Sequence, residues 1–96
     1  MAWMYILRCS DESLYVGCTT DLGTRLRRHA EGEGGSYTAK RLPITLVYSE
    51  EFLKINNALT RERQIKRWSA QKKRALISGD FRHLKALARR RRSKKV

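Results

Sequence analysis

Five side chains of this 96-residue sequence have types and spacings that could act together on a phosphate group. Arg25 and His29 are four residues apart in a stretch with helical periodicity, so both lie on one helix face. Arginine presents a planar fork of donors to phosphate oxygens, and histidine can move a proton near neutral pH. Tyr5 and Tyr15 lie in apolar runs typical of strands, and Glu62 lies in a later helix. The alternative interpretation is packing, with solvated helix charges and tyrosines that fill a core.

Glu62 is the carboxylate that packing explains least well. The apolar residues of its helix form one stripe, made of Ala58, Leu59, Ile65 and Trp68. Glu62 is four residues after Ala58 and three before Ile65, so it lies on the same inward stripe. The remaining surface of the helix is basic, with Arg61, Arg63, Lys66 and Arg67. Because burying a lone carboxylate is costly, its partner is either a divalent cation or a cation of the protein, such as Lys66.

Strand and helix signals predict the elements that must position these residues. Apolar and branched runs separated by turn residues predict strands over 3–9, 14–18 and 44–50. Helical spacing predicts helices over 21–30, 57–68, 70–79 and from 80 onward. Residues that can cap these helices lie at their starts: Thr20 or Asp21, Asn56, Ser69 and Asp80. The first helix buries Leu22, Leu26 and Ala30, and the glycine-rich residues 31–43 form a loop.

This order, β-β-α-β-α-α-α, predicts an α+β fold with a small, mainly antiparallel three-stranded sheet flanked by helices. The chain length predicts one domain, 1–88, followed by a basic tail, 89–96, whose like charges are typical of disorder. Tyr5 and Tyr15 share a face of the first hairpin only if the register is even, for example with Leu7 opposite Tyr15. That register requires a loop of odd length, or a bulge, around residues 10–13.

Charge divides the sequence into two unequal parts. Residues 1–60 hold seven basic and seven acidic side chains, whereas residues 61–96 hold fifteen basic and two acidic ones, which gives the net charge of +13. A basic half of this kind attracts a polyanion, and nucleic acid is the expected partner. A membrane partner is not expected, because no basic amphipathic helix presents a broad apolar face. A monomer is favoured over an oligomer.

The apolar residues near the start predict a cytoplasmic protein. The only uninterrupted apolar run there covers residues 3–7, which is too short for a signal peptide or a membrane span. In the cytoplasm Cys9 and Cys18 are reduced. Together with His29 and His83 they lack the spacing of a zinc site, so both cysteines are interpreted as small strand residues.

The hairpin "WMYILRC…LYVGCT", followed by "TDLGTRLRRH" and later by "ALTRERQIKRW", resembles the GIY-YIG nuclease superfamily, and in particular its small free-standing bacterial members. The similarity runs from about residue 4 to about residue 87. The two half-motifs stand as residues 3–5 and 15–17, in which the tyrosines and Gly17 match. The missing side chain of Gly17 would let a phosphate or another backbone approach closely.

The resemblance implies a role for each of the five side chains. Tyr5 and Tyr15 match the two motif tyrosines, one of which helps to activate the attacking water. Arg25 matches the arginine that contacts the scissile phosphate, and His29 matches a supporting histidine. Glu62 matches the glutamate that holds one divalent cation, Mg²⁺ or Mn²⁺. The family's late asparagine has no counterpart here.

The resemblance and the charge together predict a divalent-metal-dependent endonuclease that hydrolyses phosphodiester bonds, in DNA rather than RNA. In this mechanism the charges of Arg25 and the cation lower the pKa of the tyrosine that acts as base. The residues predicted to bind nucleic acid are Arg27, Arg28, Tyr37, Lys40, Arg41, Lys66, Arg67, Arg89, Arg90, Arg91 and Arg92. A second interpretation is a non-catalytic, basic nucleic-acid-binding module on a degenerate GIY-YIG scaffold. Glu62 distinguishes the two, because a binder of polyanions gains nothing from an inward carboxylate.

Overall fold

The computed structural model describes residues 1–79, which form two compact units: residues 1–66, and a second unit that begins at Arg67. The last predicted helix, the basic tail and the predicted domain boundary at residue 88 lie outside the described residues and stay predictions. In the part of the chain that is described, no helix is both long and apolar enough to cross a membrane.

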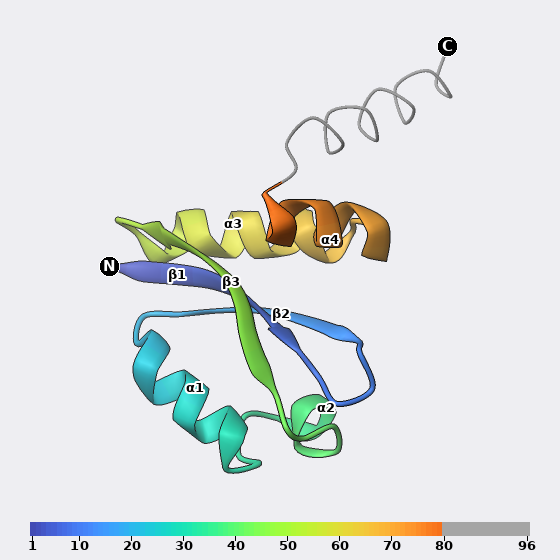
Figure 1. Cartoon of the computed structure of the whole chain (residues 1–96). Coiled ribbons are helices and arrows are strands. Elements are labelled where there is room, and N and C mark those ends of the chain that lie inside the picture. Colours follow the sequence, from blue (N-terminus) through green and yellow to red (C-terminus); the bar gives the residue numbers. More distant parts are fainter. Residues whose placement is uncertain (80–96) are drawn as a thin grey trace. The chain divides into compact units, whose positions relative to one another are not determined.

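A three-stranded antiparallel sheet is the centre of the first unit (Figure 1). Its strands are β1 (Ala2–Arg8), β2 (Leu14–Thr19) and β3 (Thr45–Phe52), in the spatial order β2-β1-β3. β1 is therefore paired on both edges, and its residues 4–7 are buried as well, each exposing 1% or less. The α+β class and the small antiparallel sheet predicted from the sequence are confirmed.

The hairpin of β1 and β2 has the register that brings the two motif tyrosines to one face. Leu7 pairs with Tyr15, and Tyr5 pairs with Gly17. Five residues, 9–13, connect the two strands, so the predicted odd loop length is confirmed. Because side chains alternate along a strand, both tyrosines and Gly17 lie on the same face of the sheet.

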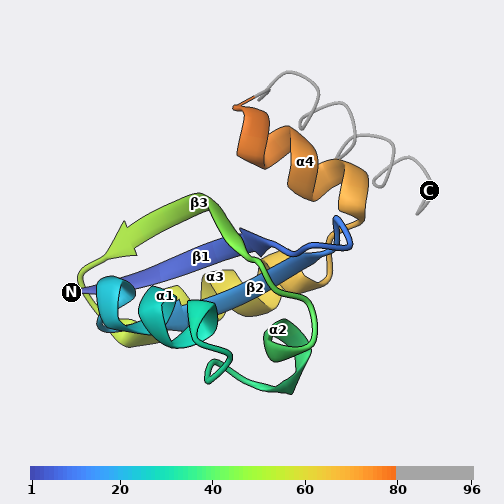
Figure 2. The same cartoon turned by 60° about the horizontal axis from the view of Figure 1, so that its bottom comes forward.

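Helices lie on both faces of this sheet (Figures 1 and 2). α1 (Leu22–Ala30) and α2 (Ser36–Ala39) lie on the face that carries Tyr5 and Tyr15. α3 (Ile55–Lys66) covers the opposite face and contacts all three strands. The sheet therefore separates the helix that carries Arg25 from the helix that carries Glu62, and the two can meet only around an edge.

An ion pair ties α3 to its face of the sheet. Arg61 donates to both carboxylate oxygens of Glu50 on β3, at 2.9 and 3.1 Å, and the hydroxyl of Tyr48 donates to the same carboxylate. Glu50 pairs with Met4 across the strands, which places it on the face opposite to Tyr5. The sequence prediction that Arg61 belongs to the exposed basic surface of its helix is wrong, because this pairing leaves the side chain half-buried.

α2 and the start of α3 differ from the sequence prediction. The stretch 31–43, predicted as a loop, contains α2, a helix too short to produce a periodic pattern. It follows Gly35, whose φ of 120° is accessible to glycine and strained for other residues. α3 begins at Ile55 rather than after Asn56, because the carbonyl of Lys54 accepts the first hydrogen bonds of the helix.

The caps of α1 and α4 (Ala70–Ser78) are those that the sequence predicts. Asp21 accepts a hydrogen bond from the N–H of Thr24 at 3.1 Å, which caps α1. Ser69 accepts one from the third residue of α4 at 3.1 Å, and Gly79 ends that helix with a left-handed φ of 76°. Local chemistry was sufficient here because a cap involves residues only two or three positions apart.

The buried face of α1 differs from the predicted one. Leu22 and Leu26 are half-buried and Ala30 is exposed, whereas His29 has no exposed surface. The prediction that Ala30 packs inward is therefore wrong. The helix turns its histidine inward because the imidazole ring has hydrogen-bond partners on both sides, which an alanine could not use.

Candidate active site

A buried chain of hydrogen bonds links β1, α1 and α2. The hydroxyl of Tyr5 lies 2.9 Å from Nε2 of His29, and Nδ1 of the same ring lies 2.8 Å from Oγ1 of Thr38. Tyr5 exposes 1% of its surface, and the other two residues expose none. The chain satisfies both ring nitrogens inside the protein and so fixes the position and the orientation of the imidazole.

Two glycines make room for the rings of this chain. A Cβ at Gly34 would lie 2.1 Å from Nδ1 of His29, and a Cβ at Gly17 would lie 2.6 Å from the hydroxyl of Tyr5. Neither contact is sterically possible, so a side chain at either position would displace a ring or the backbone. The space beside Gly17 is therefore filled by the Tyr5 phenol, and not left open for a phosphate or another backbone as the sequence suggested.

A line of aromatic rings leads from this chain toward the surface. Tyr15 is half-exposed and lies edge-on to His29, with ring centroids 5.3 Å apart, and its centroid is 6.5 Å from that of Tyr5. Tyr37 stacks on Tyr15 at 6.0 Å and exposes 38% of its surface. The two motif tyrosines are thus neighbours, but only Tyr15 reaches solvent.

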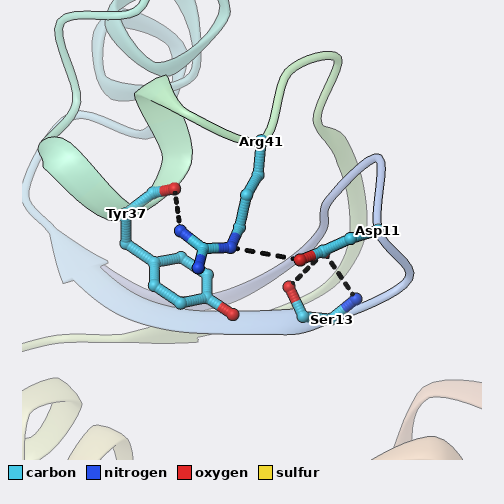
Figure 3. A network of polar contacts seen from close by, with 4 residues as sticks. All are labelled: Asp11, Ser13, Tyr37 and Arg41. Carbon is cyan, nitrogen blue, oxygen red and sulfur yellow. Dashed lines mark hydrogen bonds and ion pairs between the residues drawn. The ribbon is translucent and has the colours of Figure 1, made fainter.

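Arg41 lies at the outer end of this line of rings (Figure 3). Its guanidinium carbon is 3.8 Å from the centre of the Tyr37 ring, and it donates to the Tyr37 carbonyl at 3.0 Å and to Asp11 at 3.1 Å. The hydroxyl and the backbone N–H of Ser13 also donate to the Asp11 carboxylate. These two hydrogen bonds, and to a smaller extent Arg41, hold the pKa of Asp11 below its ordinary value. The side chains of Arg41 and Asp11 remain 33% and 49% exposed, so this ion pair is open to solvent.

Arg25 is half-buried on α1, one helical turn before His29. Its positive charge lowers the pKa of Tyr5 and His29, which lie on one face of the sheet. It also lowers the pKa of Cys18, which lies on the other face. The Cys18 thiol on the edge strand β2 is influenced by both Arg25 and Glu62, which makes the β2 edge the candidate site.

Glu62 approaches the same edge from α3. Its side chain is 15% exposed and accepts from Nζ of Lys66 at 2.9 Å, and it shares a hydrogen bond with the thiol of Cys18. Burial raises the pKa of Glu62, but these two partners outweigh burial and bring the pKa below its ordinary value. The burial of Cys18, followed by the hydrogen bond and charge of Glu62, raises the thiol pKa to about 11. The ion pair with Lys66, which the sequence offered as the alternative to a metal, is therefore present.

The donor atoms around Glu62 decide whether a divalent cation fits there. Among residues 1–79, no three His, Cys, Asp or Glu side chains come together, so that part of the chain forms no metal cage. One ionised carboxylate is sufficient for a hydrated Mg²⁺ or Mn²⁺ ion that takes its other ligands from water and substrate phosphate. Such an ion would share the carboxylate with Lys66, whose side chain is 53% exposed and can move aside. The donor set fits a hydrated ion with one protein ligand.

Tyr5 and His29 are held in their neutral forms. Burial, with a smaller contribution from Tyr15, raises the pKa of Tyr5, and Arg25 opposes this shift without cancelling it. Burial, followed by the charge of Arg25, lowers the pKa of His29. Arg25 lowers the pKa of Tyr5, as the sequence predicts, but the loss of hydration is the larger effect, so the pKa of Tyr5 stays above its ordinary value.

The residues predicted to bind nucleic acid fall into three groups. Those on exposed positions of the first unit are Arg27, Arg28 and Lys40. Those that already contact other side chains of the site are Tyr37, Arg41 and Lys66. Arg67 is exposed at the start of the second unit, and Arg89, Arg90, Arg91 and Arg92 lie outside the described residues.

Three residues of the site are absent from the sequence prediction: Thr38, Gly34 and Cys18. Thr38 and Gly34 lie in the stretch interpreted as a loop, where no periodicity marks them. Cys18 was interpreted as a small strand residue. A usable signal was present, because alternation from Tyr15 places Cys18 on the opposite face, where the helix carrying Glu62 packs.

Fold and site together define the class of this protein. Residues 1–75 match the GIY-YIG catalytic domain, and the chain belongs to the GIY-YIG family of the nuclease superfamily. Its relatives include UPF0213 proteins of similar size. The one from Haloquadratum walsbyi is 49% identical, covering 77% of this chain and 83% of its own, and the one from Streptococcus sanguinis is 46% identical, covering 79% and 87%. The solution NMR structure of a UPF0213 protein from Bacillus halodurans matches with a TM-score of 0.54 and 40% identity, over 81% of this chain and 84% of that chain.

Proposed function

We propose that this protein is a divalent-metal-dependent endonuclease that hydrolyses phosphodiester bonds in DNA. The observation that supports the proposal is the packing of Tyr5, Tyr15 and His29 against one another, with Arg25 one turn away on the helix that carries His29. Tyr5 and His29 form a buried hydrogen bond with Tyr15 packed against the same imidazole, and the charges of Arg25 and Glu62 both act on the Tyr5 phenol. Opposite charges at one edge can hold a phosphate and a cation side by side.

Arg25 and Tyr15 are the residues that we assign to the substrate. Arg25 would hold the scissile phosphate and stabilise the charge that develops on it, since a guanidinium fork matches phosphate oxygens. Tyr15 would orient and deprotonate the attacking water, because it is half-exposed, whereas Tyr5 is 1% exposed and retains its proton. His29 contacts the rings of both tyrosines and would keep Tyr15 in place.

Glu62 is the residue that we assign to Mg²⁺ or Mn²⁺. When bound, the ion would supply Lewis-acid stabilisation of the phosphate oxygens. The contribution of the chain is a carboxylate whose pKa lies below its ordinary value, so that it stays ionised at neutral pH. Cys18 and Lys66 orient that carboxylate through their hydrogen bonds.

Attraction of the nucleic acid is assigned mainly to the part of the chain after residue 66. Residues 1–66 hold ten basic and eight acidic side chains, whereas residues 67–96 hold twelve basic and one acidic. Residues 89–95 include six basic groups. Removing them should flatten the log–log salt dependence of duplex binding by about 5 if all six contact phosphates. An unchanged slope would show that these residues do not contact the nucleic acid.

A non-catalytic nucleic-acid-binding module is the competing function. The specific observation in its favour is the contact of 2.9 Å between Lys66 and Glu62, which gives the carboxylate a structural role without any metal. An endonuclease needs Glu62 and Arg25 for cleavage, whereas a binding module cuts no substrate at all.

Cleavage assays on matched pairs of variants separate the two functions. Labelled single- and double-stranded DNA and RNA are incubated with Mg²⁺, Mn²⁺ or a chelator. Glu62→Gln and Arg25→Ala should each lower the cleavage rate about 10²-fold or more, whereas Glu51→Gln and Arg8→Ala, at exposed positions outside the site, should retain it. Because Lys66 is 53% exposed, Glu62→Gln should cost only about 1 kcal/mol of stability or less, so lost cleavage would not reflect unfolding. A wild-type protein that binds these substrates and cuts none of them would establish the binding module instead.

A further inference from the structure

Two ion pairs involve the connection between β1 and β2, and their surroundings differ. Arg8 lies 4.0 Å from Glu12, and both side chains are largely exposed. Arg41 donates to Asp11 at 3.1 Å, and its guanidinium also lies over the Tyr37 ring (Figure 3). The second pair is therefore connected to the line of rings that leads through Tyr37 into the candidate site.

The guanidinium of Arg41 is held in one orientation. It donates to the Tyr37 carbonyl at 3.0 Å, and its central carbon lies 3.8 Å from the centre of the Tyr37 ring. The main chain at the same position is fixed as well, because the N–H of Ser10 donates to the Arg41 carbonyl at 2.9 Å. A cation fixed in this way loses less conformational freedom on binding a ligand than a free side chain does.

Most hydrogen-bond donors of Arg41 remain available to a ligand. A guanidinium has five N–H hydrogens. Asp11 accepts one from Nε and the Tyr37 carbonyl accepts one from Nη1, whereas Nη2 donates to no group among residues 1–79. The edge formed by Nε and Nη2 can hold two oxygens of one anion, and Asp11 uses only its Nε side. A phosphate on this edge would make the second hydrogen bond that Asp11 does not make.

Asp11 can release Arg41 at little cost. Its carboxylate also accepts from the hydroxyl and the backbone N–H of Ser13, and these two bonds lower the pKa of Asp11 more than Arg41 does. Its side chain is half-exposed, so water replaces Arg41 when the pair opens. Exposed ion pairs of this kind are weak. An anion that binds Arg41 through two oxygens can therefore displace the carboxylate.

We propose that Arg41 is a second phosphate-binding site of this protein, and that a backbone phosphate of the nucleic acid displaces Asp11 from it. Arg41 lies at the outer end of the line of rings, whereas Arg25 acts on Tyr5 and His29 at the inner end. The two arginines are therefore assigned different phosphates of one strand. This site rests on the nucleic-acid binding in the proposed function, and not on cleavage.

The displacement predicts the sign of the effect of removing Asp11. If Asp11 competes with the phosphate for Arg41, its removal should tighten the binding of nucleic acid. If Asp11 instead orients Arg41 for a phosphate that joins the intact ion pair, its removal should weaken binding. Removing any acidic group from a basic protein also favours a polyanion, so the effect must be compared with that of a matched carboxylate. Glu12, which pairs with Arg8, is that carboxylate.

Fluorescence anisotropy with a labelled DNA duplex tests the sign on the full-length protein. A chelator is present, so that binding is measured without cleavage. Asp11→Asn should lower Kd about threefold or more at low salt relative to Glu12→Gln, because only the first substitution frees Arg41. Equal Kd values in the two variants, or weaker binding in Asp11→Asn, would overturn the displacement.

A double-mutant cycle connects the effect to Arg41. In an Arg41→Gln background, Asp11→Asn should change Kd no more than Glu12→Gln does, because the group for which Asp11 competes is gone. Arg41→Gln alone should flatten the log–log salt dependence by about 0.9, the contribution of one phosphate contact. Arg8→Gln, which removes the cation of the other ion pair, should retain the wild-type slope. An unchanged slope in Arg41→Gln would overturn the phosphate site.

The outcomes for this site and for the proposed function are distinguishable. A protein that binds the duplex and cuts no substrate loses the endonuclease assignment, and the binding cycle still decides the site at Arg41. A protein that cuts DNA but shows no coupling between Asp11 and Arg41 remains an endonuclease and loses the displacement. A wild-type protein that binds no duplex would overturn both.

Discussion

The inner and outer ends of the aromatic line in the first unit are stabilised in different ways. At the inner end Tyr5, His29 and Thr38 expose 1% or less, and hydrogen bonds hold their side chains without solvent. At the outer end Arg41 and Asp11 keep 33% and 49% of their side chains exposed and are joined by an ion pair. A buried polar group cannot exchange its partner cheaply, whereas an exposed ion pair can exchange with water or a phosphate. The inner end therefore sets the geometry, and the outer end can respond to a ligand.

The largest predicted effect is at Gly34, which supports the inner end. Gly34→Ala should destabilise the protein by about 3 kcal/mol or more, because a Cβ there would overlap the ring of His29. Gly23→Ala is the control, since a Cβ at that helical position meets nothing closer than 3.9 Å and should change stability by about 1 kcal/mol or less. Urea denaturation measures both. A Gly34→Ala protein as stable as the wild type would mean that the ring is not held tightly.

Removal of a tyrosine hydroxyl should have unequal effects at the two ends. Tyr5→Phe leaves Nε2 of His29 without its partner in a buried position and should cost about 1–3 kcal/mol. Tyr37→Phe should change stability by about 0.5 kcal/mol or less, because the Tyr37 hydroxyl bonds to no other residue in the described chain. Thermal or urea unfolding compares the two variants. Equal losses would contradict the distinction between the ends.

Acid should weaken the inner end before the outer one. Because burial and Arg25 lower the pKa of His29 in the folded protein, the unfolded chain binds a proton near pH 6.5 that the folded chain does not. The stability from neutral His29 is complete above about pH 6.5 and declines below it, by at most about 1.4 kcal/mol per pH unit. Urea midpoints at pH 7 and 5.5 in the His83→Gln background measure this decline. It should vanish in His29→Gln, and a pH-independent midpoint in the protein that retains His29 would refute the assignment.

The outer end should show the smallest effect and the strongest dependence on salt. Asp11→Asn removes the partner of Arg41 and should cost less than Tyr5→Phe, because both side chains of the pair are solvated. The loss should disappear near 1 M NaCl, where the Debye length is about 3 Å. Glu12→Gln, a neighbouring exposed carboxylate whose contact with Arg8 is 4.0 Å, is the control at low salt. A salt-independent loss in Asp11→Asn would show that packing, and not charge, holds Arg41.

Sequence prediction succeeded where a signal is local or periodic. The caps at Asp21 and Ser69, and the shared face of Tyr5 and Tyr15, follow from short-range chemistry and from alternation along strands. The partners of His29 could not be predicted, because Thr38 has meaning only once α2 packs beside α1. The direction in which the pKa of Tyr5 shifts could not be predicted either, because it depends on the burial of Tyr5 in the tertiary structure.

The connection between β1 and β2 limits how this chain can change length. Its five residues, 9–13, set Tyr15 opposite Leu7 and against His29. Insertion or deletion of a single residue there would slip the pairing by one and turn Tyr15 and Gly17 toward α3. Chains that retain the site must therefore vary this loop in steps of two residues, or add a compensating bulge. Relatives that keep the site intact should therefore have an odd number of residues between β1 and β2, in addition to the site residues themselves.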